Sequence, residues 1–230
     1  MKKFSILIPS RGRPKDLEYC IDSLFCMAHN PRRVEVIYRV DEDDPMLSRY
    51  SEAPGVKKII GPRYHGYASN WRFIEDCAGQ SFGNYLMQMV DTAQMLTTEW
   101  DMIYEEAIMS NPIAVVASKV LNEHGNLAYC WSFPLITRQL YALAGCFCLG
   151  QNPSVDRCWE AFAEEMDCGL IAPVNILHKE RRGSDQEDDT ARESLCFYAG
   201  LHSNWDKRSS EFRQIGKRYA EIVKGKLNES

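Results

Sequence analysis

The chain has 230 residues, enough for one large α/β domain or for one domain with an appendage. Its 27 Lys and Arg are outnumbered by 32 Asp and Glu, and this balance argues against a surface coated with positive charge for nucleic acid, although it leaves room for a local basic patch. The nine cysteines are odd in number and lack CxxC spacing, and no apolar run approaches the roughly 18 residues of a membrane span, so we expect a cytoplasmic protein with reduced thiols.

The first half of the chain alternates apolar runs of strand length with amphipathic helices. We expect helices from Pro14 to about Ala28, from Ala68 to Ala78 and from Glu99 to Met109, with Pro14 as a first-turn proline. The expected strands are 4–8, 34–40, 56–60, 85–90 and 113–117. This alternation predicts an α/β fold, in which helices flank both faces of an open, mostly parallel sheet.

The second half is less regular. We expect a strand at 127–131, a turn at 133–138 that leads into the helix 139–144, and an amphipathic helix at 155–166. A further strand at 171–177 contains Pro173 and is therefore placed at a sheet edge. The strongly charged residues 178–193 are expected to form a loop or lid.

The tail predicts an amphipathic helix that docks through Phe212, Ile215, Tyr219 and Ile222, which recur at spacings of three and four. Its polar side gives two alternatives, a solvated face or a strip that binds phosphate. The basic residues between 207 and 226 are Lys207, Arg208, Arg213, Lys217, Arg218, Lys224 and Lys226. We expect a main domain at 1–205, with a nucleotide-binding half at 1–117 and an acceptor-side half at 118–205, followed by the helix 206–230.

Polar residues follow four of the predicted strands at their carboxyl ends, which share one edge of such a sheet. They are Ser10, Arg11 and Arg13 after the first strand, Asp41 and Asp43 after the second, residues 65–70 with His65 and Asn70 after the third, and Asp91 after the fourth. Arginines grip phosphate, and carboxylates are hard ligands for Mg²⁺ or Mn²⁺, so this set suits a nucleoside diphosphate with a metal. The alternatives are that the arginines only pair with 41–44 and that Asp91 only caps a turn.

These segments resemble the nucleotide-sugar half of family 2-like glycosyltransferases of the GT-A fold, and most closely the compact bacteriophage-type members. The resemblance lies in Phe4–Pro14, in Val34–Val36 running on to Val40–Asp44, in Asn70, and in Val90–Asp91 with Thr97 and Trp100–Asp101. It continues more weakly through Phe133–Pro134, Arg138, Gly145, the helix with Asp156, and His178 to Thr190.

The resemblance implies that Pro9, Ser10, Arg11 and Asp41, with Asp43 behind it, surround the nucleoside, and we group Arg13, His65 and Asn70 with them. It implies that Asp91 is the metal carboxylate that neutralises the leaving diphosphate. The family has a second acid one or two positions on, where this chain has Thr92 and Ala93. His178 is the residue we expect to complete the Mn²⁺ or Mg²⁺ site, the alternative being a surface or hydrogen-bonded histidine.

An inverting enzyme needs a carboxylate base that takes the proton of the acceptor hydroxyl. Asp156 is the first candidate, because its helix resembles the element that bears the base in the family, and Asp188 and Asp189 are the alternatives. Asp156 also has a purely structural explanation, as a first-turn acid that the helix dipole favours.

We therefore expect a metal-dependent, inverting glycosyltransferase that uses a nucleotide diphosphate sugar, with a UDP-sugar as the expected donor. The phage resemblance makes a hydroxylated base in DNA a candidate acceptor, beside a surface glycan, and would place the protein in the host cytoplasm. The rival hypothesis is a degenerate module that binds a sugar nucleotide or nucleic acid without catalysis, which the missing second acid motivates.

Overall fold

The structure is a computed structural model that describes residues 3–65, 69–109, 111–128, 130–151, 155–179 and 205–229, without the side chains of 69, 70, 130, 151 and 205–209. The strands are β1 (Phe4–Pro9), β2 (Val34–Asp41), β3 (Val56–Gly61), β4 (Tyr85–Gln88), β5 (Ala93–Met95), β6 (Val115–Leu121), β7 (Leu135–Thr137) and β8 (Gly169–His178). The helices are α1 (Pro14–Met27), α2 (Ser69–Gly79), α3 (Trp100–Ile108), α4 (Arg138–Ala144), α5 (Val155–Met166) and α7 (Trp205–Asn228). Short 3-10 helices lie at Pro31–Arg33, Leu47–Arg49, Cys130–Ser132 and Leu149–Gln151.

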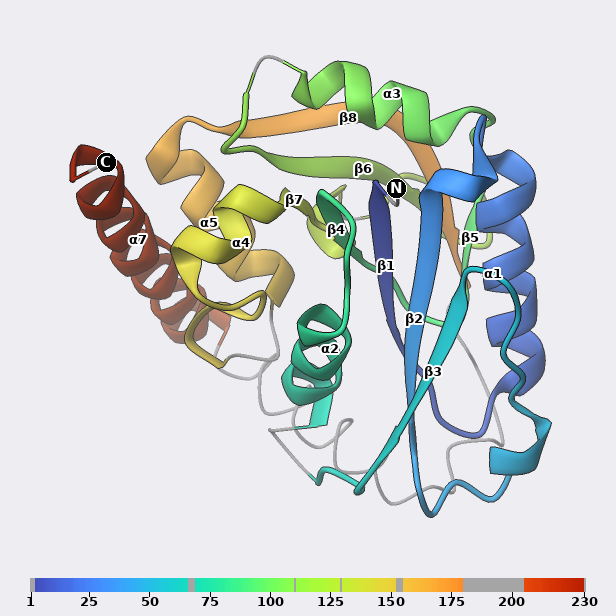
Figure 1. The fold of residues 1–230 in the computed structure, drawn as a ribbon. Helices are drawn as coiled ribbons and strands as arrows, with labels where there is room; N and C mark the ends of the chain where they lie inside the picture. The colour runs from blue at the N-terminus through green and yellow to red at the C-terminus, as the bar shows by residue number, and fades with distance from the viewer. Residues whose placement is uncertain are drawn as a thin grey trace.

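The described strands form one mixed sheet in the order β3-β2-β1-β4-β7-β6-β8-β5. β1 lies inside it, parallel to β2 through Phe4↔Val34 and to β4 through Phe4↔Tyr85. The ladders β2–β3 and β6–β8 are also parallel, whereas β4–β7, β6–β7 and β5–β8 are antiparallel. The predicted α/β class is confirmed, and the arrowheads of β1, β2 and β3 point to the same end of the molecule (Figure 1).

Helices cover both faces of the sheet, each over its own apolar cluster (Figure 1). On one face, α1 and α3 bury residues such as Leu24 and Trp100 against the sheet. On the other, α2, α4, α5 and α7 bury residues such as Trp159 and Phe212. Full burial of one large apolar side chain stabilises the fold by about 1.5–3 kcal/mol, so these two cores hold the strand ends in fixed positions.

α1 begins as its sequence predicts. Pro14 stands in its first turn, where the missing N–H has no helical partner to lose. Leu17, Cys20 and Leu24 recur at spacings of three and four, and all three are buried. The helix therefore starts directly after the loop that follows β1, and it fixes that loop at its far end.

Two short strands were not predicted, and one predicted strand is wrong. β5 and β7 have three residues each, too few to show a period of two, and they form because β8 and β4 offer antiparallel partners. The expected strand at 127–131 is instead an isolated bridge, Leu121↔Leu127, followed by a 3-10 helix at Cys130–Ser132.

β8 contains Pro173 but is not an edge strand, since β6 pairs with it on one side and β5 on the other. β5 reaches only Ile176, Leu177 and His178, so Pro173 lies where β8 has a single neighbour. The β6–β8 register also shifts between the pairs Ala117↔Ile171 and Lys119↔Asn175, and Pro173 falls inside this irregularity. Its missing N–H therefore costs no regular ladder bond.

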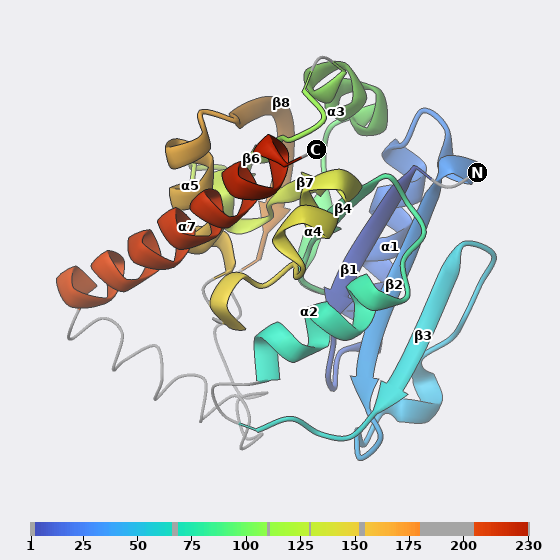
Figure 2. The same cartoon turned by 60° about the vertical axis from the view of Figure 1, so that its left-hand side comes forward.

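α7 packs lengthwise against α5 and also contacts α4, as Figure 2 shows. Gly216 makes the close approach possible, because a Cβ there would lie 2.7 Å from the backbone nitrogen of Phe162. Phe212 is buried as predicted, but Ile222 is 38% exposed. Ala220 and Val223 are buried in its place. The predicted docking of the tail helix is thus confirmed, but at its C-terminal end the buried face is formed by different residues than predicted.

The described cysteines are all free thiols. Cys20, Cys77, Cys148, Cys158 and Cys168 are buried, and burial raises the pKa of each thiol. These thiols are therefore packing residues. Of the described helices, none combines the length and the apolar character that a membrane crossing requires.

Candidate functional site

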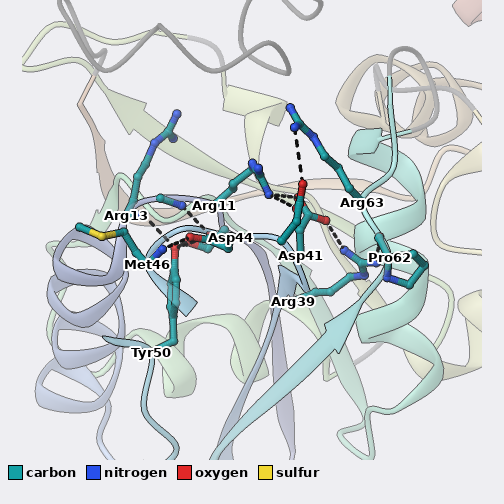
Figure 3. A network of polar contacts seen from close by, with 12 residues as sticks. Arg11, Arg13, Arg39, Asp41, Asp44, Met46, Tyr50, Pro62 and Arg63 are labelled. Carbon is teal, nitrogen blue, oxygen red and sulfur yellow. Dashed lines mark hydrogen bonds and ion pairs between the residues drawn. The ribbon is translucent and has the colours of Figure 1, made fainter. Parts of the chain in front are cut away.

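The loop after β1 is held in place by the segment that follows β2 (Figure 3). Gly12 adopts a φ of 68°, in the left-handed region that favours glycine, and its amide donates to Asp44 Oδ2 at 2.8 Å. The Arg13 amide donates to the Tyr50 hydroxyl at 2.9 Å. With the backbone fixed at both residues, the side chains of Arg11 and Arg13 project from the loop in different directions.

Asp41 ends β2 and binds two guanidinium groups. Its Oδ1 accepts from Arg39 Nη1 at 2.9 Å, and its Oδ2 accepts from Arg11 Nη1 at 3.0 Å. The side chain is 1% exposed, and burial raises the pKa of Asp41 while the two arginines act in the opposite direction. The ends of β1 and β2 are therefore linked by an ion pair.

Arg39 is a buried cation that the predictions missed. Its Nε donates to Asp76 Oδ2 at 2.7 Å and its Nη2 to the Pro62 carbonyl at 2.6 Å. The guanidinium lies over the rings of Tyr64 and Phe73, 4.5 Å and 4.3 Å from their centroids, and the two rings also contact each other. An arginine inside the apolar run of β2, two residues before Asp41, was the available signal for a buried ion pair.

Asp43 and Asp44 have different environments. Asp43 is half exposed, and its carboxylate accepts from Arg11 Nη1 at 2.6 Å and pairs with Arg63 Nη1 at 3.6 Å, so that Arg11 lowers its pKa. Asp44, which we did not single out, binds the amides of Gly12 and Met46 and so supports the backbone of both loops. No sequence signal identified Tyr50 or Arg63 as parts of the cluster.

Asp91 lies in the turn between β4 and β5 and joins the same cluster. Its Oδ2 accepts from the Ser10 hydroxyl at 2.8 Å, and its Oδ1 accepts from Arg13 Nη1 at 3.1 Å. The side chain is only 3% exposed, and burial raises the pKa of Asp91 against the effect of Arg13 and Ser10. The structure thus gathers Ser10, Arg11, Arg13, Asp41, Asp43 and Asp91 at one edge of the sheet, beside Pro9 at the end of β1.

Other predicted site residues are not joined to this cluster by any described contact. His178 ends β8 opposite Ala93, and its ring packs edge-on against Phe133 with centroids 5.6 Å apart. His65 is exposed in the segment after β3. The backbone of Asn70 lies in the first turn of α2, but its side chain falls outside the description, as do Asp188 and Asp189 entirely.

The described side chains around Asp91 do not form a set of ligands that fits a divalent cation. Both carboxylate oxygens already accept hydrogen bonds, and the guanidinium of Arg13 stands where a cation would be repelled. Within the described ranges, no three His, Cys, Asp or Glu side chains gather as metal ligands. The Mn²⁺ or Mg²⁺ site expected from Asp91 and His178 stays a prediction.

A cavity of about 80 Å³ is lined in part by Asp91. It lies between the start of α1 and the β5–β8 edge. Its lining residues are Asp16, Tyr19, Asp91, Thr92, Gln94 and Lys179. The Lys179 amide donates to the Thr92 carbonyl at 3.3 Å, which keeps Lys179 next to the turn that carries Asp91. Two acids, Asp16 and Asp91, and one cation, Lys179, therefore line the same cavity.

Asp156 stands in the first turn of α5, half buried, and burial raises its pKa to about 6. The charged neighbours that act on it are Arg157, which lowers the pKa, and Glu160, which raises it, both on its own helix. A carboxyl group with this pKa changes its charge just below neutral pH, which suits a general base.

No family model matches the chain, and no curated protein matches it by sequence. Among solved structures it resembles S. aureus TarS 1-349, with a TM-score of 0.59 and 12% identity over 77% of this chain and 60% of that one. The same fragment in complex with UDP-GlcNAc gives 0.61 and 12% over 79% and 60%, and in complex with UDP 0.57 and 11% over 77% and 60%. The chain thus spans about 60% of these proteins, and the likeness, at this identity, shows the fold alone, which is of the GT-A glycosyltransferase type.

Proposed function

We propose that the chain is a glycosyltransferase that moves a sugar from a nucleoside diphosphate donor, a UDP-sugar in the first instance, to a hydroxyl acceptor. The observation that carries this proposal is the cluster at the ends of β1, β2 and β4, where Arg11 binds Asp41 and Arg13 binds Asp91. Crevices outside the carboxyl ends of parallel strands are where open α/β sheets bind ligands. The fold supports it, since this chain resembles TarS, whose structures include complexes with UDP and UDP-GlcNAc.

In this proposal the residues of the cluster have separate tasks. Ser10, Arg11, Asp41 and Asp43 surround the nucleoside, and Arg13 and Asp91 lie toward the diphosphate. Cations near the diphosphate stabilise the charge that develops as the sugar leaves. A carboxylate base on the acceptor side, Asp156 in the first instance, takes the proton of the attacking hydroxyl and leads to inversion at the anomeric carbon. Asp188 and Asp189 are the alternatives for this base.

For the acceptor we propose a hydroxylated base in DNA, because α7 bears exposed cations. Two of its lysines are already engaged within the protein. Lys224 binds the Glu165 carbonyl at 3.1 Å and Lys226 binds the Leu143 carbonyl at 2.6 Å, and these contacts fasten the helix to its neighbours. Arg213, Lys217 and Arg218 remain exposed on α7, and contacts of these residues with phosphate would make binding depend steeply on salt. A surface glycan is the second acceptor class.

The test is sugar release and transfer by the full chain with a panel of nucleotide sugars. We expect hydrolysis of one donor, and transfer to hydroxymethylated duplex DNA in preference to an unmodified duplex or a glycan. Transfer to the glycan alone would reject DNA as the acceptor. Binding of a nucleoside diphosphate without release of sugar from any donor would instead support the rival function, a catalytically inactive module that binds sugar nucleotides or nucleic acid.

If Asp156 is the base, activity depends on whether its carboxyl group is ionised. The carboxylate form is the active one, so kcat/KM should rise with pH through about 6 and then level off. Asp156→Asn should lower kcat/KM by about 10²–10⁴-fold and remove this limb of the pH profile. Steady-state kinetics across this pH range, with Glu164→Gln on the exposed side of the same helix as control, measures both effects. A variant that loses stability but keeps its activity would mark Asp156 as a purely structural helix acid.

A further inference from the structure

We propose that the Arg13 guanidinium, anchored on Asp91, binds the donor diphosphate in place of a divalent cation, so that nucleotide binding needs no metal. This inference rests on the proposed function and concerns the same site. It follows from how the carboxylates of the cluster are already paired, and from where the unused donors of Arg13 lie.

Asp91 is arranged as an anchor for a cation of the protein itself. Ser10 fixes one oxygen at 2.8 Å and Arg13 the other at 3.1 Å, in a side chain that is 3% exposed. A divalent ion bound to these oxygens would stand within a few ångströms of the guanidinium, and like charges at that distance repel each other strongly in a buried site. Binding a metal here therefore requires that Arg13 leave.

The neighbouring carboxylates are engaged in the same way. Asp41 binds Arg39 and Arg11, and Asp43 binds Arg11 and Arg63. Each acid of the cluster is thus matched by guanidinium groups, whereas a metal site gathers carboxylates whose charges the metal itself neutralises. The described cluster already contains the positive charge that a metal would otherwise supply.

Arg13 has donors left for a ligand. Within the described part of the chain, Asp91 is the one side chain that its guanidinium contacts, and this contact uses Nη1. Its side chain is 38% exposed and points away from the Asp44–Tyr50 contacts (Figure 3). Nε and Nη2 remain in the planar geometry that suits the paired oxygens of a phosphate.

Lys179 supplies a second positive charge near Asp91. It is exposed and lines the same cavity as Asp91, together with the acid Asp16. Arg13 binds the Asp91 carboxylate and Lys179 shares its cavity, so two cations lie near one buried acid. Two cations that contact the diphosphate would do electrostatically what a bound metal does in the transition state.

The experiment is calorimetric titration of the full chain with UDP and, for comparison, GDP, CDP and TDP, in EDTA and then in Mn²⁺. We expect one of these nucleotides to bind in EDTA, with an affinity that Mn²⁺ changes by less than about threefold. Arg13→Met should weaken binding of that nucleotide about ten- to hundredfold, the loss of one charge-assisted contact. Binding of the corresponding nucleoside, which lacks phosphate, should stay unchanged. A general loss of structure would instead weaken binding of both the nucleotide and the nucleoside.

Two controls keep the outcome clear. Arg49→Met removes an exposed arginine whose described hydrogen bond is to the sulfur of Met46, and this variant should bind the nucleotide like the unchanged protein. The double variant Arg13→Met/Asp91→Asn removes the pair together, leaves no unpaired buried charge, and should show the same loss as Arg13→Met. Nucleotide binding that appears only with Mn²⁺, or that survives Arg13→Met, overturns this inference and leaves the proposed function in place. If no nucleoside diphosphate binds under either condition, the proposed function fails, and this inference with it.

Discussion

Replacement of Arg39 by methionine should lower the free energy of unfolding by about 3–5 kcal/mol, the cost of breaking a buried ion pair from one side. The guanidinium is fully buried, connects Asp41, Asp76 and the Pro62 carbonyl, and packs over two aromatic rings. Without it, Arg11 is the one described side chain still paired with Asp41, in a site that is 1% exposed. Urea denaturation measures the effect as a lower midpoint with an unchanged slope.

The pH dependence of the Arg39→Met variant separates lost charge from lost packing. Removal of the arginine should raise the pKa of Asp41 further in the folded state. A carboxyl group with a raised folded pKa stabilises the protein below its unfolded pKa, and this contribution disappears as pH rises through the folded pKa. The deficit of the variant should therefore be larger near neutral pH than at about pH 4. The control is Arg49→Met on the exposed surface, which should change the free energy of unfolding by no more than about 0.5 kcal/mol. A loss of less than about 1 kcal/mol in Arg39→Met would contradict the buried-pair explanation.

Asp91→Asn should lower both the affinity for the donor nucleotide and kcat/KM about ten- to hundredfold while the protein remains folded. The amide can still accept from Ser10, but it loses the charge that orients Arg13, and a charge-assisted contact contributes about 1.5–3 kcal/mol. Stability should change little, because the partner left behind, Arg13, is 38% exposed and stays hydrated. Calorimetry and steady-state kinetics measure the two losses, with thermal unfolding as the check on the fold.

A matched control for Asp91→Asn is Asp101→Asn. Asp101 is equally buried, but its oxygens accept from the amides of His29 and Asn30, at 2.7 Å and 3.1 Å, in the loop after α1. This variant should lose about 1–2 kcal/mol of stability without a change in nucleotide affinity. The raised pKa of Asp91 adds a pH dependence. As pH falls, Asp91 should become protonated at a higher pH than an ordinary aspartate. Nucleotide affinity should decrease over the same pH range, because the charge that orients Arg13 is lost. Wild-type affinity in Asp91→Asn would show that Asp91 does not position the site.

The core of the fold could be predicted because local patterns determine it. The apolar run at 4–8, the first-turn Pro14 and the helical spacing of Leu17, Cys20 and Leu24 define β1 and α1 without reference to the rest of the chain. The three-residue strands β5 and β7 have no such pattern. They exist because β8 offers β5 a partner and β4 and β6 offer β7 partners.

The sequence by itself determined which strand ends carry polar residues, and the rule that parallel strands share a carboxyl edge brought Ser10, Arg13, Asp41 and Asp91 to one place. Only the tertiary structure decided how these charges pair. Arg13 and Asp91 are 78 residues apart, and Arg39 meets Asp76 across 37, so their contacts depend on strand register and on the turn at Gly12. The role of Asp91 changed for this reason: its sequence position marks it as a candidate metal ligand, whereas burial beside a guanidinium makes it the anchor of a protein cation.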